Sequence, residues 1–200
     1  MAAAGKVCTG FSLPYVAKYG ESGGTVSYTL GQKLARGVSV SIAPEVADSN
    51  NFYADNVLAE SVTGTFTGGT VTLTVDGLLP AAEALIFGLG NATTESTVSV
   101  YKYGDNSTPP YCGVGFIARY MSDGVASYKV IVLRKVKFSL PTEAANTQEE
   151  TIDWQTQALE ATLMRDDTTS HDWKYVAATE YSTEALAEAD LKKLLGISNG

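Results

Sequence analysis

Alternation of apolar and polar residues is the sequence feature that most constrains the fold of this chain. In residues 69–77, GTVTLTVDG, the side chains of Val71, Leu73 and Val75 alternate with threonines. Because successive side chains of a β-strand point to opposite faces, this pattern predicts a half-buried strand. Similar patterns predict further strands in residues 25–30, 36–44, 57–64, 96–104, 112–121, 127–138, 154–164 and 173–179.

One strand differs from the others, because residues 130–133 are apolar at every position. A strand that is buried on both faces lies in the middle of a sandwich or against a neighbouring chain. A second exception is the segment from Gly113 to Ala118, whose letters match a dinucleotide-binding fingerprint. That fingerprint must open a helix, whereas this segment lies within a strand pattern. Its glycines are therefore expected to allow a bend or the close approach of a neighbouring strand.

Helical patterns occur in two places. In residues 78–90, Pro80 suits a first turn and Gly88 or Gly90 can end the helix. In residues 182–195, Ser182 is the expected N-cap and Gly196 follows the last turn. No repeat and no linker divide the chain, so residues 1–200 are expected to form one mainly antiparallel β domain with two helices.

The charge of the chain is negative and unevenly spread. There are 14 Lys and Arg residues against 22 Asp and Glu, a net charge of −8, which disfavours general duplex binding because that requires cations to neutralise phosphates. Residues 101–139 carry six basic and two acidic side chains, whereas residues 140–190 carry two basic and twelve acidic ones. This separation favours head-to-tail self-association, and the alternative is that the two regions pair within one fold.

The sequence offers no constellation of catalytic residues. Its one histidine, His171, lies in a polar stretch typical of a surface loop, and no nucleophile motif accompanies it. Cys8 and Cys112 lack the spacing of a zinc site and are expected to be reduced and packed. We therefore predict no enzymatic activity, no cofactor, no metal and no membrane partner, and a chain without signal peptide or membrane span.

Several segments in order carry a resemblance to a known family. They are the Gly115-Phe116 strand, the strand end at residues 135–139, the acidic turn at residues 147–151 and the strand that ends at Asp166. The segments at residues 49–56 and 69–88 precede them, and a Ser-Thr-Glu-Ala helix start at residues 182–185 follows. In this order the chain resembles the major tail proteins of long-tailed siphophages and prophages, the phi13-type tail tube subunits.

The resemblance implies a tail tube fold, a β-sandwich or half-barrel with a flanking helix, that assembles as hexameric rings stacked into a hollow tube. Such a tube would stand in the virion tail, after assembly in the host cytoplasm, and guide genomic DNA into the host without binding it specifically. Tape measure and tail terminator proteins are its implied further partners. An acidic lumen would repel phosphates, and strand alternation nominates Glu60, Asp153 and Glu160 for it.

A long loop at residues 43–57 is the candidate contact between subunits. It carries Phe52, Tyr53, Asp55 and Asn56, and exposed aromatic side chains in a subunit would serve as anchors against a neighbour. The alternative is that the two aromatics fold back on their own sheet.

Two functions of other classes stay open. Eleven tyrosines and two tryptophans could stack on sugar rings in a carbohydrate-binding β-sandwich. A glycosidase-like enzyme is supported only by abundant carboxylates, among which no pair stands out.

Overall fold

The computed structural model describes residues 5–148, 150 and 153–198, and its architecture is mainly antiparallel β with two helices. The prediction of a mainly β, sandwich-like fold is thereby confirmed. The strands are β1 (Val7–Ser22), β2 (Thr25–Lys33), β3 (Gly37–Val46), β4 (Asn50–Ala54), β5 (Val57–Val62), β6 (Phe66–Val75), β7 (Thr93–Glu95), β8 (Val98–Val100), β9 (Tyr111–Ser122), β10 (Val125–Phe138), β11 (Gln157–Met164) and β12 (Lys174–Val176), and the helices are α1 (Pro80–Phe87) and α2 (Glu184–Leu194).

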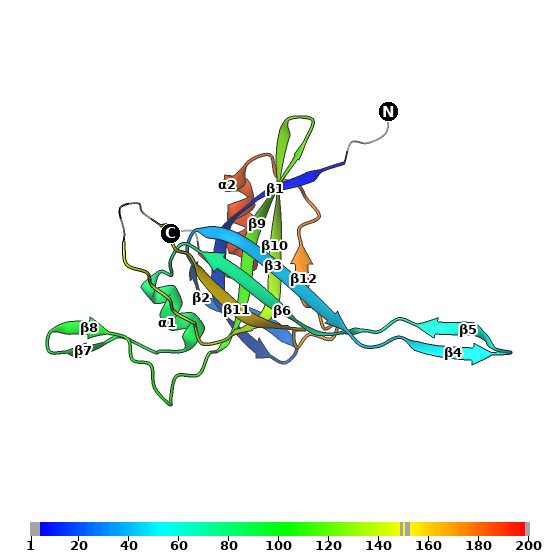
Figure 1. Ribbon diagram of the computed structural model, residues 1–200, viewed down its shortest axis with the longest axis horizontal. Coiled ribbons are helices and arrows are strands. Elements are labelled where there is room, and N and C mark those ends of the chain that lie inside the picture. The colour runs from blue at the N-terminus through cyan, green and yellow to red at the C-terminus, as the bar shows by residue number, and fades with distance from the viewer. Residues whose placement is uncertain (1–4, 149, 151–152, 199–200) are drawn as a thin grey trace.

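One eight-stranded antiparallel sheet forms the body of the molecule, and two hairpins stand apart from it (Figure 1). The strand order in the sheet is β2-β1-β9-β10-β11-β6-β3, and β12 pairs with β10 beside this path. The strands β4 and β5 form one separate hairpin, and β7 and β8 form the other.

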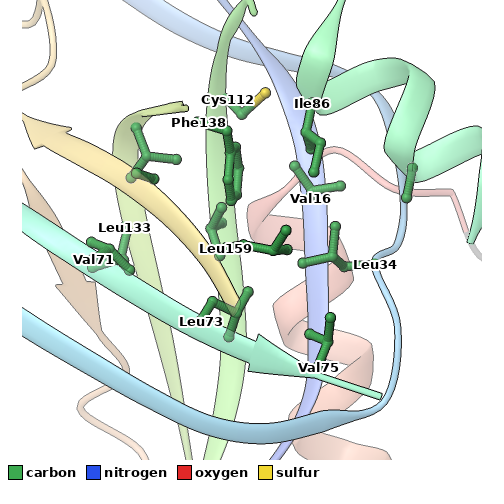
Figure 2. Close-up of a cluster of buried hydrophobic side chains, with 14 of the residues drawn as sticks. Val16, Leu34, Val71, Leu73, Val75, Ile86, Cys112, Leu133, Phe138 and Leu159 are labelled. Carbon is green, nitrogen blue, oxygen red and sulfur yellow. The ribbon is translucent and has the colours of Figure 1, made fainter. Parts of the chain in front are cut away.

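The main core lies between the β3, β6 and β11 part of the sheet and its β1, β9 and β10 part. Figure 2 shows buried side chains of β6 and β11, among them Leu73 and Leu159, gathered with Leu133 and Phe138 of β10, while Ile86 reaches in from α1. This arrangement explains the alternation in β6, because its apolar residues face the core and its threonines face outward.

Helix α2 covers the other face of β9 and β10. Val130 and Val132 of β10 pack with Leu191 of α2, whereas Leu133 belongs to the main core. Both faces of this strand are therefore buried within one chain, which accounts for its apolar run.

Two glycines of β9 allow close packing by side chains. A Cβ atom at Gly113 would lie 2.4 Å from the ring of Tyr28, and one at Gly115 would lie 2.4 Å from Leu191. The expectation of close approach is confirmed, but the approaching groups are a tyrosine ring and α2 rather than the backbone of a neighbouring strand.

The helix ends that were predicted from the sequence agree with the structure at all but one residue. Pro80 lies in the first turn of α1, and Gly88 follows its end with a φ of 67°. In α2 the N-cap is Thr183, whose side chain accepts a hydrogen bond from Leu186 N, so the prediction of Ser182 was wrong by one position.

Two further expectations are corrected. The N-terminal strand β1, with 16 residues, was not predicted, because bulges and Pro14 interrupt its alternation. The prediction of a long loop at residues 43–57 is wrong as well, because these residues form the end of β3, the strand β4 and a tight turn into β5. Asp55 and Asn56 have φ values of 52° and 62°, as the central residues of a type I′ hairpin turn require.

Candidate functional site

A projecting hairpin is the most distinctive surface feature of the chain. We define the arm as residues 47–65, which contain β4 and β5 and join β3 to β6. The amide of Ala47 donates a hydrogen bond to the carbonyl of Thr65 at 2.9 Å and closes the arm at its root. The arm extends far from the body (Figure 1).

The arm exposes large apolar side chains. Phe52 and Tyr53 are each 62% exposed, and Val57, Leu58 and Val62 are exposed as well. The alternative that the aromatics fold back on their own sheet is therefore wrong. An isolated two-stranded hairpin is marginally stable in water, and exposed apolar patches mark interaction sites. The arm thus has the composition of an interaction surface.

The arm is also acidic. It contains Asp48, Asp55 and Glu60, and it has no lysine or arginine. Phe52 and Glu60 are paired across the hairpin, so a carboxylate and an aromatic ring share one face of the ribbon. A partner surface that matches the arm should therefore be apolar and neutral or basic.

Two grooves flank α1, which lies at the end of the body opposite to the arm (Figure 1). The first, of about 790 Å³, we call the acidic groove, because its lining includes Asp76, Glu83, Glu143 and Glu160. The second, of about 640 Å³, lies between α1 and β1 and β2, and its one charged lining residue is Lys18. We call this second space the basic groove.

The outer face of β3, β6 and β11 is lined with small polar side chains, and we call it the hydroxyl face. The strand register places Glu160 beside Thr72, and Thr72 beside Ser41. The neighbouring outward positions hold similar residues, namely Thr70, Thr74, Thr162, Ser39, Ala43 and Ala158. Within the paired parts of β3, β6 and β11, no aromatic residue and no long apolar side chain interrupts these rows, and on β10 the row of Thr162 continues into Lys137.

The three proposed lumen residues do not come together. Glu160 lies on the hydroxyl face, Glu60 lies on the arm, and Asp153 is exposed in the segment before β11. The expected strand at residues 154–164 begins only at Gln157, which leaves Asp153 outside the sheet. Of the three residues, only Glu160 belongs to the hydroxyl face.

The basic and acidic segments of the sequence pair with each other inside the fold. Arg134 on β10 contacts Asp166 at 2.8 Å, and Lys135 contacts Asp167 at 2.6 Å. Burial raises the pKa of Asp166, but hydrogen bonds from Thr168 and Arg134 outweigh burial, so its pKa lies below the ordinary value. The alternative of internal pairing is thus correct for these ions, and the charge separation in the sequence is no argument for self-association.

Many tyrosine side chains form hydrogen bonds within the fold. Their hydroxyl groups donate to carboxylates at 2.5 to 2.8 Å in four cases, from Tyr15 to Glu188, Tyr19 to Asp167, Tyr103 to Glu83 and Tyr181 to Asp190. The ring of Trp173 stacks on Phe66, whereas Trp154 is 84% exposed. Trp154 is thus the tryptophan that remains available for stacking on a sugar.

The remaining candidates for chemistry are few. In the part of the chain that the structure describes, no three His, Cys, Asp or Glu side chains are grouped as metal ligands. His171 lies in the turn before β12, where its ring approaches the carbonyl of Asp166 at 3.4 Å. Cys112 is buried as expected, but Cys8 is exposed. Neither described helix has the length and apolar character needed to cross a membrane.

The sequence indicated the exposed aromatic residues of the arm but did not indicate that the arm is a separate hairpin. Val57, Leu58 and Val62 were assigned to a strand, but the alternation could not show that the strand pairs only with β4. The Asp55-Asn56 pair was the available signal, because both residues tolerate the positive φ values of a hairpin turn. The basic groove had no sequence signal, since distant segments form it.

No protein-family model matches the chain, and no curated protein matches it in sequence.

Proposed function

We propose that this chain is a structural subunit that associates with copies of itself, as the major tail proteins do that it resembles, in rings stacked into a hollow tube. The observation that carries the proposal is the arm, whose residues 47–63 are all exposed although they include Phe52, Tyr53 and Leu58. Full burial of such side chains contributes about 1.5–3 kcal/mol each, and in the free subunit the arm gains only part of it. A neighbouring copy would supply the missing cover.

The hydroxyl face suits the wall of a channel. Most of its side chains are short, and its charges are those of Glu160 and of Glu45, which lies two residues beyond Ala43 on β3. Nucleic acids are held by cations that neutralise phosphates and by aromatic platforms that stack on bases. The three strands of this face present neither, and the cation that borders them is Lys137 of β10, beside Thr162. Under the proposal Glu160 faces the lumen, and DNA passes without being retained.

Electron microscopy and sedimentation of the purified protein across a concentration series test the assembly. Wild-type protein should form rings or tubes, and the double variant Phe52→Ser, Tyr53→Ser should stay monomeric with unchanged circular dichroism. The matched control is Val98→Ser on the other hairpin, because Val98 is 59% exposed and lies outside the arm. Control and wild type should assemble alike.

Two results would contradict the proposal. One is wild-type protein that remains monomeric at every concentration and salt tested, and the other is a double variant that forms normal tubes. A monomer that binds oligosaccharides and loses this binding on Trp154→Ala would favour the carbohydrate-binding alternative instead.

The channel wall is tested separately by reversing its charge. Tubes of Glu160→Lys should assemble normally but retain duplex DNA against nuclease, and particles that carry them should eject DNA more slowly. Asp105→Lys, in an exposed loop, is the control and should behave as wild type. Normal ejection by Glu160→Lys would remove this residue from the lumen.

A further inference from the structure

We infer that the arm of one copy docks in the basic groove of the next copy, with Phe52 and Tyr53 against α1 and the arm's carboxylates near Lys18. This inference rests on the proposed self-assembly and adds the site that receives the arm. The groove is defined by residues of β1 and β2, by α1 and by the segment that follows it; Lys18, Leu30, Leu85, Tyr101 and Pro110 are among its lining residues.

The placement of the two surfaces makes the contact head to tail. The arm leaves the body at the end where β3 joins β6 through the hairpin, and α1 lies at the opposite end (Figure 1). The arm points away from α1 and from its own basic groove, so the groove that receives it must belong to a second copy. Contacts between two different surfaces of identical subunits propagate, as a stacked assembly requires.

Charge distinguishes between the two grooves beside α1. The arm carries three carboxylates and no basic residue. In the acidic groove it would meet Asp76, Glu83, Glu143 and Glu160, and like charges brought together at an interface are strongly unfavourable. The basic groove has Lys18 as its one charged lining residue, and the structure shows Lys18 exposed.

The chemistry of the basic groove matches the tip of the arm. Leu30 is 68% exposed in the free subunit, and Leu85, Tyr101 and Pro110 add apolar surface beside it. The volume of about 640 Å³ is within the range of about 300–1,000 Å³ that is typical of pockets that enclose drug-sized ligands. The arm and the groove would therefore bury apolar side chains of both copies in one contact.

Disulfide trapping tests the contact in the assembled protein. In a Cys8→Ser background, one copy carries Tyr53→Cys and the other Leu30→Cys; burial raises the pKa of Cys112 to about 12, so this thiol stays unreactive. An equal mixture of the two singly substituted proteins, oxidised after assembly, should give covalent dimers, and neither protein alone should. The control uses Leu140→Cys in place of Leu30→Cys, because Leu140 is 60% exposed in the lining of the acidic groove, and it should give none.

A charge exchange provides a second, independent measurement. Lys18→Glu should raise the concentration needed for assembly by about tenfold, and adding Glu60→Lys to it should restore assembly. Glu143→Lys in the acidic groove should leave assembly unchanged.

The outcomes separate the inference from the proposal on which it depends. The docking site is overturned, with self-assembly left in place, by tubes in which Tyr53→Cys forms dimers with the Leu140→Cys protein and not with the Leu30→Cys protein. Tubes that are strengthened by Glu143→Lys and unaffected by Lys18→Glu overturn it in the same way. Wild-type protein that never assembles overturns both the docking site and self-assembly.

Discussion

The body and the arm are built from the same kind of strand but differ in what stabilises them. In the body, Phe87 and Leu73 are almost completely buried, and the buried Arg134–Asp166 pair is held by hydrogen bonds. No buried side-chain N or O atom among the described residues lacks a hydrogen-bond partner. In the arm, every residue from 47 to 63 is exposed, and no ion pair of the described chain involves it.

The difference shows that a hairpin turn and strand-forming residues can specify a geometry without contributing to the stability of the domain. The apolar side chains of the body stabilise the monomer, because folding removes them from water. Those of the arm stay largely in water after folding, so under the proposed self-assembly they stabilise the protein only when copies associate. Stability of the monomer and assembly should therefore be separable by substitution.

The largest effect is expected from a matched pair of phenylalanines. Phe87→Ala removes a fully buried ring from the main core and should lower the free energy of unfolding by about 3–5 kcal/mol. Phe52→Ala removes a ring that is 62% exposed and should change it by less than about 0.5 kcal/mol while impairing assembly. Urea unfolding of the monomer measures both changes in the free energy of unfolding. A large loss of stability in Phe52→Ala would mean that the arm is part of the folding core.

A smaller but distinctive effect is expected at the buried ion pair. Asp166→Asn leaves the Arg134 guanidinium without its counter-charge and should cost about 3 kcal/mol at neutral pH. Because the pKa of folded Asp166 lies below its ordinary value of 3.8, the stabilisation is complete above that value and is lost as pH falls through the folded pKa. The difference between wild type and variant should therefore shrink below about pH 4.

Unfolding measured from pH 2 to pH 7 checks this prediction. Asp55→Asn, at an exposed carboxylate of the arm, is the control and should leave the monomer's stability nearly unchanged. A constant difference between wild type and Asp166→Asn across the whole range would mean that the pair does not stabilise the body electrostatically.

The smallest effect is expected at the tip of the arm. Asn56 has a φ of 62°, so Asn56→Gly should favour the turn by about 0.5 kcal/mol and protect arm amides from hydrogen exchange roughly twofold. Asn56→Val should have the opposite effect, since a β-branched residue disfavours positive φ. Amides of β9 and β10 should be unaffected by either change, and a shift there would show that tip and body are coupled.

The strands with regular alternation could be predicted from the sequence, because burial on one face leaves a period of two. The apolar run of β10 and the end of α1 at Gly88 were predictable for the same local reasons. Strand β1 was not, since its bulges break the period. The arm was predicted only in part, since its exposed apolar residues leave no burial pattern that shows where the strand of residues 57–64 pairs. The grooves depend on segments that meet only in the fold, so no local pattern indicates them.

The composition of the arm also affects how it withstands digestion. From Gly37 to Tyr101 the chain contains no lysine or arginine, a stretch that includes both projecting hairpins. Proteases of the trypsin class cut after basic residues and therefore find no cleavable bond in either one. The two projecting hairpins should therefore resist this class of enzyme in the free subunit.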